Sequence, residues 1–98
     1  MASTKEYVSF IVEQLGLLDN IIYKPMMGEY LLYYNNVLIG GIYDNRFLIK
    51  ITKNNNKYHL EEAIPYDKAK PMYLVDNIDN KEELKNIVLD TYNDLKGR

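Results

Sequence analysis

Hydrophobic positions between residues 24 and 50 form three apolar runs, which two short polar turns separate. Asn35-Asn36 and Asp44-Asn45 form the turns, and Asn and Asp tolerate the positive φ angles that two-residue type I′ hairpins require. Successive side chains of a strand point to opposite faces. The pattern therefore predicts a three-stranded antiparallel meander.

Pairing Tyr34 with Val37 and Tyr43 with Arg46 sets the register of this meander. One face has Glu29 as its only charged member, and we assign it to the core. Its residues are Glu29, Leu31, Tyr33, Leu38, Gly40, Ile42, Phe47, Ile49 and Ile51. The other face mixes aromatic side chains with two cations, and we expect it to be partly exposed. Its residues are Tyr30, Leu32, Tyr34, Val37, Ile39, Gly41, Tyr43, Arg46, Leu48, Lys50 and Thr52.

The alternative is a bulge at Gly40-Gly41, because a glycine inside a strand often marks one. A single bulged residue would exchange the faces of every residue beyond it. The sequence leaves both possibilities open.

Two segments that flank the meander have the apolar spacing of amphipathic helices. Ser3-Thr4-Lys5-Glu6 has the form of a capping box, in which the Ser3 hydroxyl accepts from the Glu6 amide. The apolar stripe that follows consists of Val8, Ile11, Leu15 and Leu18. In the second segment Asn80 is the expected cap. Its stripe consists of Leu84, Ile87, Val88, Thr91 and Leu95.

The apolar stripes of two such helices can be buried against the one apolar face of the sheet. We therefore predict an α+β fold, a two-layer sandwich with both helices on one face of an antiparallel meander, as a single domain over residues 1–98. Further strands are expected at Ile21 to Met26 and Met72 to Val75, with their prolines at edges or strand starts. The polar stretch between Lys53 and Lys70 is expected to hold one helical turn around Leu60 to Ala63.

Composition limits the setting and the partners. The sequence has no cysteine, which excludes disulfides. Its formal charge of −2 and its pI near 5.3 give it no global attraction to phosphate, which argues against direct nucleic-acid binding. No N-terminal run has the form of a signal peptide, and no apolar run approaches the ~20 residues of a membrane span. We expect a cytoplasmic protein with no membrane contact.

Candidate chemistry is sparse. His59 stands in the polar connection without metal-ligand or nucleophile spacing, the carboxylates are dispersed, and Gly40-Gly41 matches no phosphate loop. We therefore expect no catalytic residues, no metal and no cofactor. The ten tyrosines leave three interpretations open. They are a stacking platform for single-stranded nucleic acid, a surface for a protein partner or a second copy, and plain strand propensity.

The order of short motifs resembles the N-terminal domain of the TfoX/Sxy family of bacterial competence regulators. The first motif is Lys24-Pro25-Met26-Met27-Gly28, and the meander then ends in residues 44–50, DNRFLIK. Pro65-Tyr66 and Ala69-Lys70-Pro71-Met72, followed by the closing helix, are similar to a small stand-alone branch of that family. The resemblance implies a fold shared with YgaC-like domains. The positions that match the family pattern are Lys24, Met26, Met27, Gly28, Asp44, Arg46 and Lys50.

The same resemblance implies a role in transcription. Its full-length members carry a second, helical domain and promote transcription of DNA-uptake genes, whereas this sequence ends at Arg98, so we expect the N-terminal domain alone. Our leading hypothesis is a non-enzymatic interaction module that docks transcription machinery, an activator or its own copy as a homodimer. The expected surface is a tyrosine-rich face formed by Tyr30, Tyr34, Tyr43, Arg46 and Lys50. The alternative is a small anionic ligand, or a cryptic enzyme, at Lys24, Arg46 and Lys50.

Overall fold

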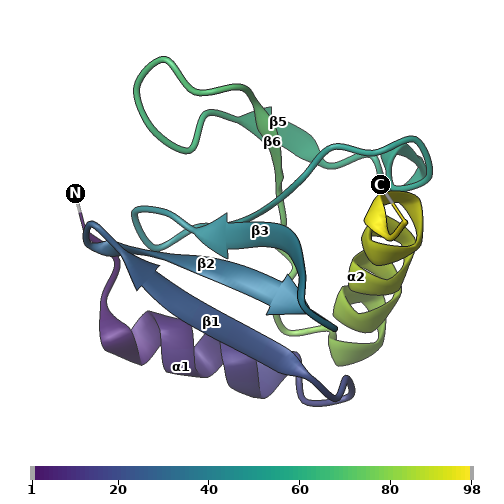
Figure 1. Ribbon diagram of the computed structural model, residues 1–98, viewed down its shortest axis with the longest axis horizontal. Coiled ribbons are helices and arrows are strands. Elements are labelled where there is room, and N and C mark those ends of the chain that lie inside the picture. The colour runs from purple at the N-terminus through teal and green to yellow at the C-terminus, as the bar shows by residue number, and fades with distance from the viewer. Residues whose placement is uncertain (1, 98) are drawn as a thin grey trace.

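A computed structural model describes residues 2–97, which form a six-stranded antiparallel sheet and two α-helices (Figure 1). The chain is therefore an α+β protein, as predicted. The elements are α1 (Lys5–Gln14), β1 (Ile21–Met26), β2 (Glu29–Tyr34), β3 (Val37–Ile42), β4 (Phe47–Ile49), a 3₁₀ turn (Asn56–Tyr58), β5 (Glu61–Ala63), β6 (Met72–Leu74) and α2 (Lys81–Leu95).

The strand order is β1-β2-β3-β4-β6-β5, so the first four strands form the expected meander and the last two form a hairpin at its edge. Pro25 lies in the edge strand β1 opposite Tyr30, where its missing amide breaks no ladder. The helical turn expected at Leu60 to Ala63 is wrong. Ala63 pairs with Met72 and extends the sheet, and tertiary pairing of this kind overrides local propensity.

Three two-residue turns with positive φ at both positions connect the first four strands. The turns at Asn35-Asn36 (φ 49° and 65°) and Asp44-Asn45 (φ 54° and 54°) confirm the predicted hairpins. The remaining turn, between β1 and β2, is Met27-Gly28, with φ 51° and 87°. Its first residue is neither glycine nor asparagine, which is uncommon in this conformation.

A bulge at Ile39 corrects the predicted faces. Tyr33 pairs with Leu38 but Leu32 pairs with Gly40, so Ile39 is the extra residue. The predicted assignment is right for Ile42, Phe47 and Ile49, which are buried in the core. It is wrong for the residues on the other side of the bulge, because Leu32 and Ile39 are fully buried while Leu31, Tyr33 and Leu38 point to the opposite face.

The predicted burial of Ile51 in the core is wrong. Its side chain is 41% exposed, since β4 ends at Ile49 and the chain turns away from the core beyond it.

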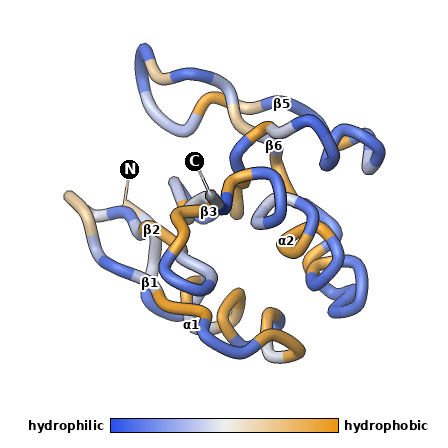
Figure 2. The backbone as a smooth tube through the Cα atoms, turned by 45° about the vertical axis from the view of Figure 1, so that its right-hand side comes forward, coloured by the Kyte–Doolittle hydropathy of each residue, from blue (hydrophilic) through white to orange (hydrophobic). Residues whose placement is uncertain are grey.

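Both helices pack against one face of the sheet and form the second layer (Figure 1). Along each helix hydrophobic and hydrophilic residues alternate, as an apolar stripe requires (Figure 2). The helices supply Val8, Ile11, Leu84, Ile87 and Val88 to the core cluster. Among residues 2–97 no helix has the length and apolar character needed to cross a membrane.

The expected capping box at Ser3 is wrong, whereas the expected cap at Asn80 is confirmed. The residue that caps α1 is Thr4, whose hydroxyl accepts from the Tyr7 amide at 3.1 Å. The Ser3 hydroxyl donates instead to the Glu29 carboxylate at 2.6 Å. The Asn80 side chain accepts from the Glu83 amide at 3.0 Å.

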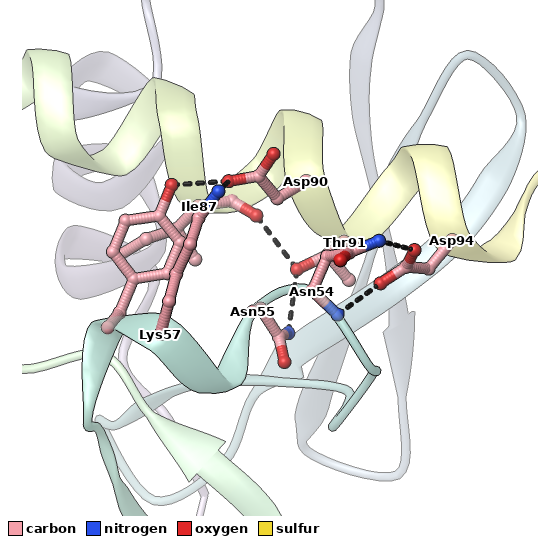
Figure 3. Close-up of polar contacts among 8 residues, drawn as sticks. Asn54, Asn55, Lys57, Ile87, Asp90, Thr91 and Asp94 are labelled. Carbon is pink, nitrogen blue, oxygen red and sulfur yellow. Dashed lines mark hydrogen bonds and ion pairs between the residues drawn. The ribbon is translucent and has the colours of Figure 1, made fainter.

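Polar contacts tie the loop after β4 to α2 (Figure 3). The buried Asn55 donates to the Lys50 carbonyl at 2.8 Å and to the Thr91 hydroxyl at 2.9 Å, and Thr91 in turn donates to the Ile87 carbonyl. These bonds satisfy polar groups that would otherwise be buried without partners. They hold the end of β4, and with it Lys50, in one position.

Asp90 receives two partners from the same loop. Lys57 forms an ion pair with it at 3.1 Å, and the Tyr58 hydroxyl donates a hydrogen bond to the same carboxylate oxygen. Burial first, and then the bond to the negatively charged Asp90, raise the pKa of Tyr58 above its ordinary value. The neutral hydroxyl is therefore the form that the folded state favours.

We expect Gly40→Ala to destabilise the protein by at least about 3 kcal/mol or to prevent folding, measured by urea unfolding. A Cβ at this position would overlap the Leu48 carbonyl oxygen and lie 2.8 Å from the Ile49 Cα, and neither backbone atom can move aside cheaply. Gly97→Ala is the control. Gly97 has φ 81°, but a Cβ at this position would have no atom within 4 Å, so the variant should lose only about 1 kcal/mol of stability. Equal losses in the two variants would contradict the explanation.

We expect Tyr58→Phe to cost about 1 kcal/mol near neutral pH and to flatten the loss of stability in alkali. Because the pKa of Tyr58 is raised in the folded state, its contribution is complete below the unfolded-state value of about 10 and falls as pH rises above that value. Urea unfolding across the alkaline range measures this. An identical alkaline decline in wild type and variant would show that Tyr58 does not contribute to it.

Candidate functional site

The face of the sheet opposite the helices is the open face. Residues 64–71, which connect β5 and β6 and are here called the strap, lie on the far side of the meander from α1 (Figure 1). Pro65 is buried although its neighbours in the strap are exposed, so it anchors this segment. The strap and the open face together enclose a hollow.

This hollow has a volume of about 570 Å³ and is open to solvent. Its sheet wall includes Met26, Leu31, Leu38, Tyr43, Lys50 and Ile51. Its other wall is formed by the strap and the start of β6, with Pro65, Tyr66, Ala69, Lys70, Pro71 and Met72. A smaller hollow of about 460 Å³ adjoins it and shares Met26, Tyr43 and Tyr66. We call the two together the methionine groove.

All three methionines in the range 2–97 line this groove, although they come from two distant parts of the chain. Met26 ends β1, Met27 forms the tip of the β1–β2 turn, and Met72 begins β6. Met27 is 98% exposed, so it contributes almost nothing to the core. Its left-handed backbone conformation therefore costs free energy that no internal packing offsets.

Tyr43 and Tyr66 form the junction between the two hollows. Their ring centroids are 5.9 Å apart with the planes tilted by 49°. Burial raises the pKa of Tyr43, and the neighbouring Tyr66 and Glu29 raise it further. Tyr43 is therefore a neutral hydroxyl at physiological pH, and its shift is opposite to the one that would activate a nucleophile.

Arg46 holds the strap in place. Its Nε donates to the Tyr43 carbonyl at 3.1 Å, and its Nη2 donates to the carbonyls of Ile64 at 3.1 Å and Pro65 at 3.4 Å. The planar guanidinium thus bridges the β3–β4 turn and the strap, which a single ammonium cannot do. In this structure Arg46 acts as a positioning residue for one wall of the groove.

Of the residues predicted to form the site, Met26, Met27, Tyr43 and Lys50 lie together at the groove. Lys24 lies on the same open face, with its Nζ 5.0 Å from the centroid of the Tyr33 ring.

Tyr30 and Tyr34 do not join this group. Both lie on the helix side of the sheet, where Tyr34 makes an edge-to-face contact with Tyr92 of α2 at 4.9 Å. The expected tyrosine-rich face of Tyr30, Tyr34 and Tyr43 is therefore not formed, because the bulge at Ile39 separates the first two from the third.

Gly28 and Asp44 belong to a different set of contacts that fixes the start of the chain. The Gly28 carbonyl accepts from the Ser3 amide at 3.0 Å, and one Glu29 carboxylate oxygen accepts from the amides of Ser3 and Asp44, both at 3.1 Å. The Asn45 amide donates to the Ser3 hydroxyl at 3.0 Å. These bonds join the β1–β2 turn to the β3–β4 turn through residues 2–4, which gives both Gly28 and Asp44 a structural role.

Sequence reasoning missed the strap side of the groove. Pro65-Tyr66 and residues 69–72 were noted only as motifs of a resemblance, within a stretch interpreted as a polar connection. Pro65, Tyr66 and Met72 are the apolar residues that indicate a second wall, but no periodic pattern connects them to the sheet. No cluster of His, Asp or Glu side chains suited to a metal ion is found among residues 2–97.

The chain is thus a small α+β protein with a groove between a strap and the open face of an antiparallel sheet. The chain belongs to the same family as the "Uncharacterized 12.7 kDa protein in trpE 5′ region" of Spirochaeta aurantia. The two sequences are 32% identical over 80 residues, which cover 80% of this chain and 70% of that protein. No model of a known protein family matches the chain.

We expect Arg46→Lys to loosen the strap while leaving the core folded. The amide of Ala69, which donates to the Tyr66 carbonyl at 3.0 Å, should exchange its hydrogen about tenfold faster, and global stability should fall by no more than about 1 kcal/mol. Native-state hydrogen exchange measures the first and urea unfolding the second. Lys53→Arg, at an exposed position away from the strap, is the matched control. Unchanged exchange at Ala69 in Arg46→Lys would contradict the positioning role.

Proposed function

We propose that this protein is a non-enzymatic interaction module that holds an apolar segment of a protein partner in the methionine groove. The observation that carries this proposal is the convergence of Met26, Met27 and Met72 on one groove of the sheet face that the helices leave uncovered. Methionine is flexible and polarisable, and it is common on surfaces that accommodate peptide side chains. Exposed apolar hollows of this kind on a small protein are typical of interaction sites.

The polar groups of the groove support binding rather than catalysis. The described residues that line it offer two lysines, two tyrosines and the Glu29 carboxylate. Glu29 already accepts hydrogen bonds from Ser3 and Asp44, and Tyr43 is held neutral. A nucleophile needs an adjacent base or a lowered pKa, and this set supplies neither.

The resemblance to the TfoX/Sxy N-terminal domain suggests a setting for this module. We place it in the cytoplasm as a transcriptional co-regulator related to competence regulators, with a YgaC-like and TfoX-like fold and with transcription machinery or an activator as its partner. The residues of the resemblance that line the groove are Met26, Met27 and Lys50 on the side of the meander, and Pro65, Tyr66, Ala69, Lys70, Pro71 and Met72 on the other wall. A homodimer through the same groove is the alternative use of this surface.

We expect Met27→Asn to stabilise the protein by about 0.5 kcal/mol and at the same time to abolish partner retention. Asn is favoured in the left-handed conformation that Met27 adopts at φ 51°, and the exposed Met27 side chain contributes no core packing that would be lost. Urea unfolding gives the stability, and capture from an extract of the native cells followed by mass spectrometry gives the partner.

Leu17→Asn is the matched control, because Leu17 is 50% exposed but does not line the groove. The control should retain the partner that wild type retains. Light scattering over a concentration series tests the homodimer. Retention of the same proteins by wild type and Met27→Asn, with both monomeric, would remove the groove from the proposed function.

A further inference from the structure

We infer that the partner segment is acidic and places an Asp or Glu carboxylate beside an apolar side chain in the larger hollow. This inference rests on the proposed function and names the chemistry of its partner.

The charged side chains that line the larger hollow are all cations. Lys50 and Lys70 line the larger hollow from opposite walls, and no Asp or Glu lines it. The single carboxylate of the smaller hollow, Glu29, accepts hydrogen bonds from Ser3 and from the Asp44 amide. Neither lysine forms an ion pair with any residue in the range 2–97. The larger hollow therefore presents two cations and no carboxylate.

Both lysines are held by a fixed backbone. The Lys50 amide donates to the Ile39 carbonyl at 2.9 Å, and its own carbonyl accepts from Asn55 at 2.8 Å. Lys70 belongs to the strap, which Arg46 and the buried Pro65 anchor. An apolar group that fills the hollow excludes water from its surroundings, which strengthens the attraction between these ammonium groups and an anion.

A second copy of this chain fits the groove less well than an acidic partner. A two-fold contact between two open faces would bring Lys50 and Lys70 of one protomer toward the same lysines of the other. Like charges in a buried contact cost free energy. Charge complementarity therefore favours a partner with the opposite sign.

The shape of the groove favours a peptide over a free fatty acid. It consists of two joined hollows that are open to solvent, whereas a pocket for a small ligand buries most of its occupant. Two neighbouring hollows with a shared junction suit two apolar side chains of one segment. The carboxylate then lies next to the side chain that occupies the larger hollow, between Lys50 and Lys70.

The experiment begins with a random-peptide phage library selected on the immobilised wild-type protein. We expect recovered peptides to be enriched in Asp or Glu next to Leu, Met or an aromatic residue. Fluorescence anisotropy then gives their affinity for wild type and for the double variant Lys50→Gln/Lys70→Gln. That variant should bind at least about tenfold more weakly. Lys53→Gln/Lys81→Gln, with the same change of charge at exposed positions outside the groove, should stay within about twofold of wild type.

A double-mutant cycle tests direct contact. Replacing the acidic residue of the peptide by its amide should weaken binding to wild type but should have little further effect on the double variant. NMR of protein labelled at the methionine methyl groups locates the peptide, because Met26, Met27 and Met72 report on the groove.

The outcomes separate the two proposals. Peptides that shift these methyl signals but show no acidic preference, and bind the double variant as tightly as wild type, overturn the acidic partner and leave the proposed function standing. Recovery of no peptide that shifts the methionine signals overturns both. Decanoate that shifts the same signals and binds more tightly than every recovered peptide, or a dimer that occupies the groove in wild type, also overturns the acidic partner.

Discussion

The close approach of β4 to Gly40 is the constraint on which the rest of this structure depends. No side chain fits between the two backbones at this point, since a Cβ on residue 40 would overlap the Leu48 carbonyl oxygen. The adjacent bulge at Ile39 turns the strand so that Leu32, Ile39 and Ile42 all enter the core beneath the helices. The same bulge directs Leu31 and Leu38 to the opposite face of the sheet. Core and groove are thus two results of one local adjustment in β3.

Local chemistry was enough to predict most of the elements. The two Asn- and Asp-containing turns, the bounds of β1 and the cap at Asn80 depend on residues within a few positions of one another. Which side chains of β2 face the core depends instead on which residue of β3 is bulged. A pair of glycines indicates that a bulge is near without showing its position. The predicted cap at Ser3 is wrong because of a contact that is also distant in sequence. The Ser3 hydroxyl donates to the Glu29 carboxylate.

Only the sheet wall of the candidate site could be predicted from the sequence. Met26, Met27, Tyr43 and Lys50 were singled out from the sequence, and all four line the groove. The wall supplied by the strap could not be predicted, because it is placed by hydrogen bonds from the Arg46 side chain to backbone carbonyls. A carbonyl is present in every residue, so no amino-acid pattern identifies which one accepts. The sequence singles out Arg46 for a partner or an anionic ligand, whereas its guanidinium makes this internal contact.

The contacts of residues 2–4 affect how the protein is best handled. These residues are hydrogen-bonded between the turns that carry Met27 and Asp44, and a Cβ on Gly28 would lie only 3.2 Å from the Ala2 Cβ. A purification tag fused ahead of Ala2 would therefore emerge beside the mouth of the groove and obstruct whatever enters it. The other end of the chain leaves from α2, on the opposite side of the molecule (Figure 1). Attachment to a solid support through that end keeps the groove accessible.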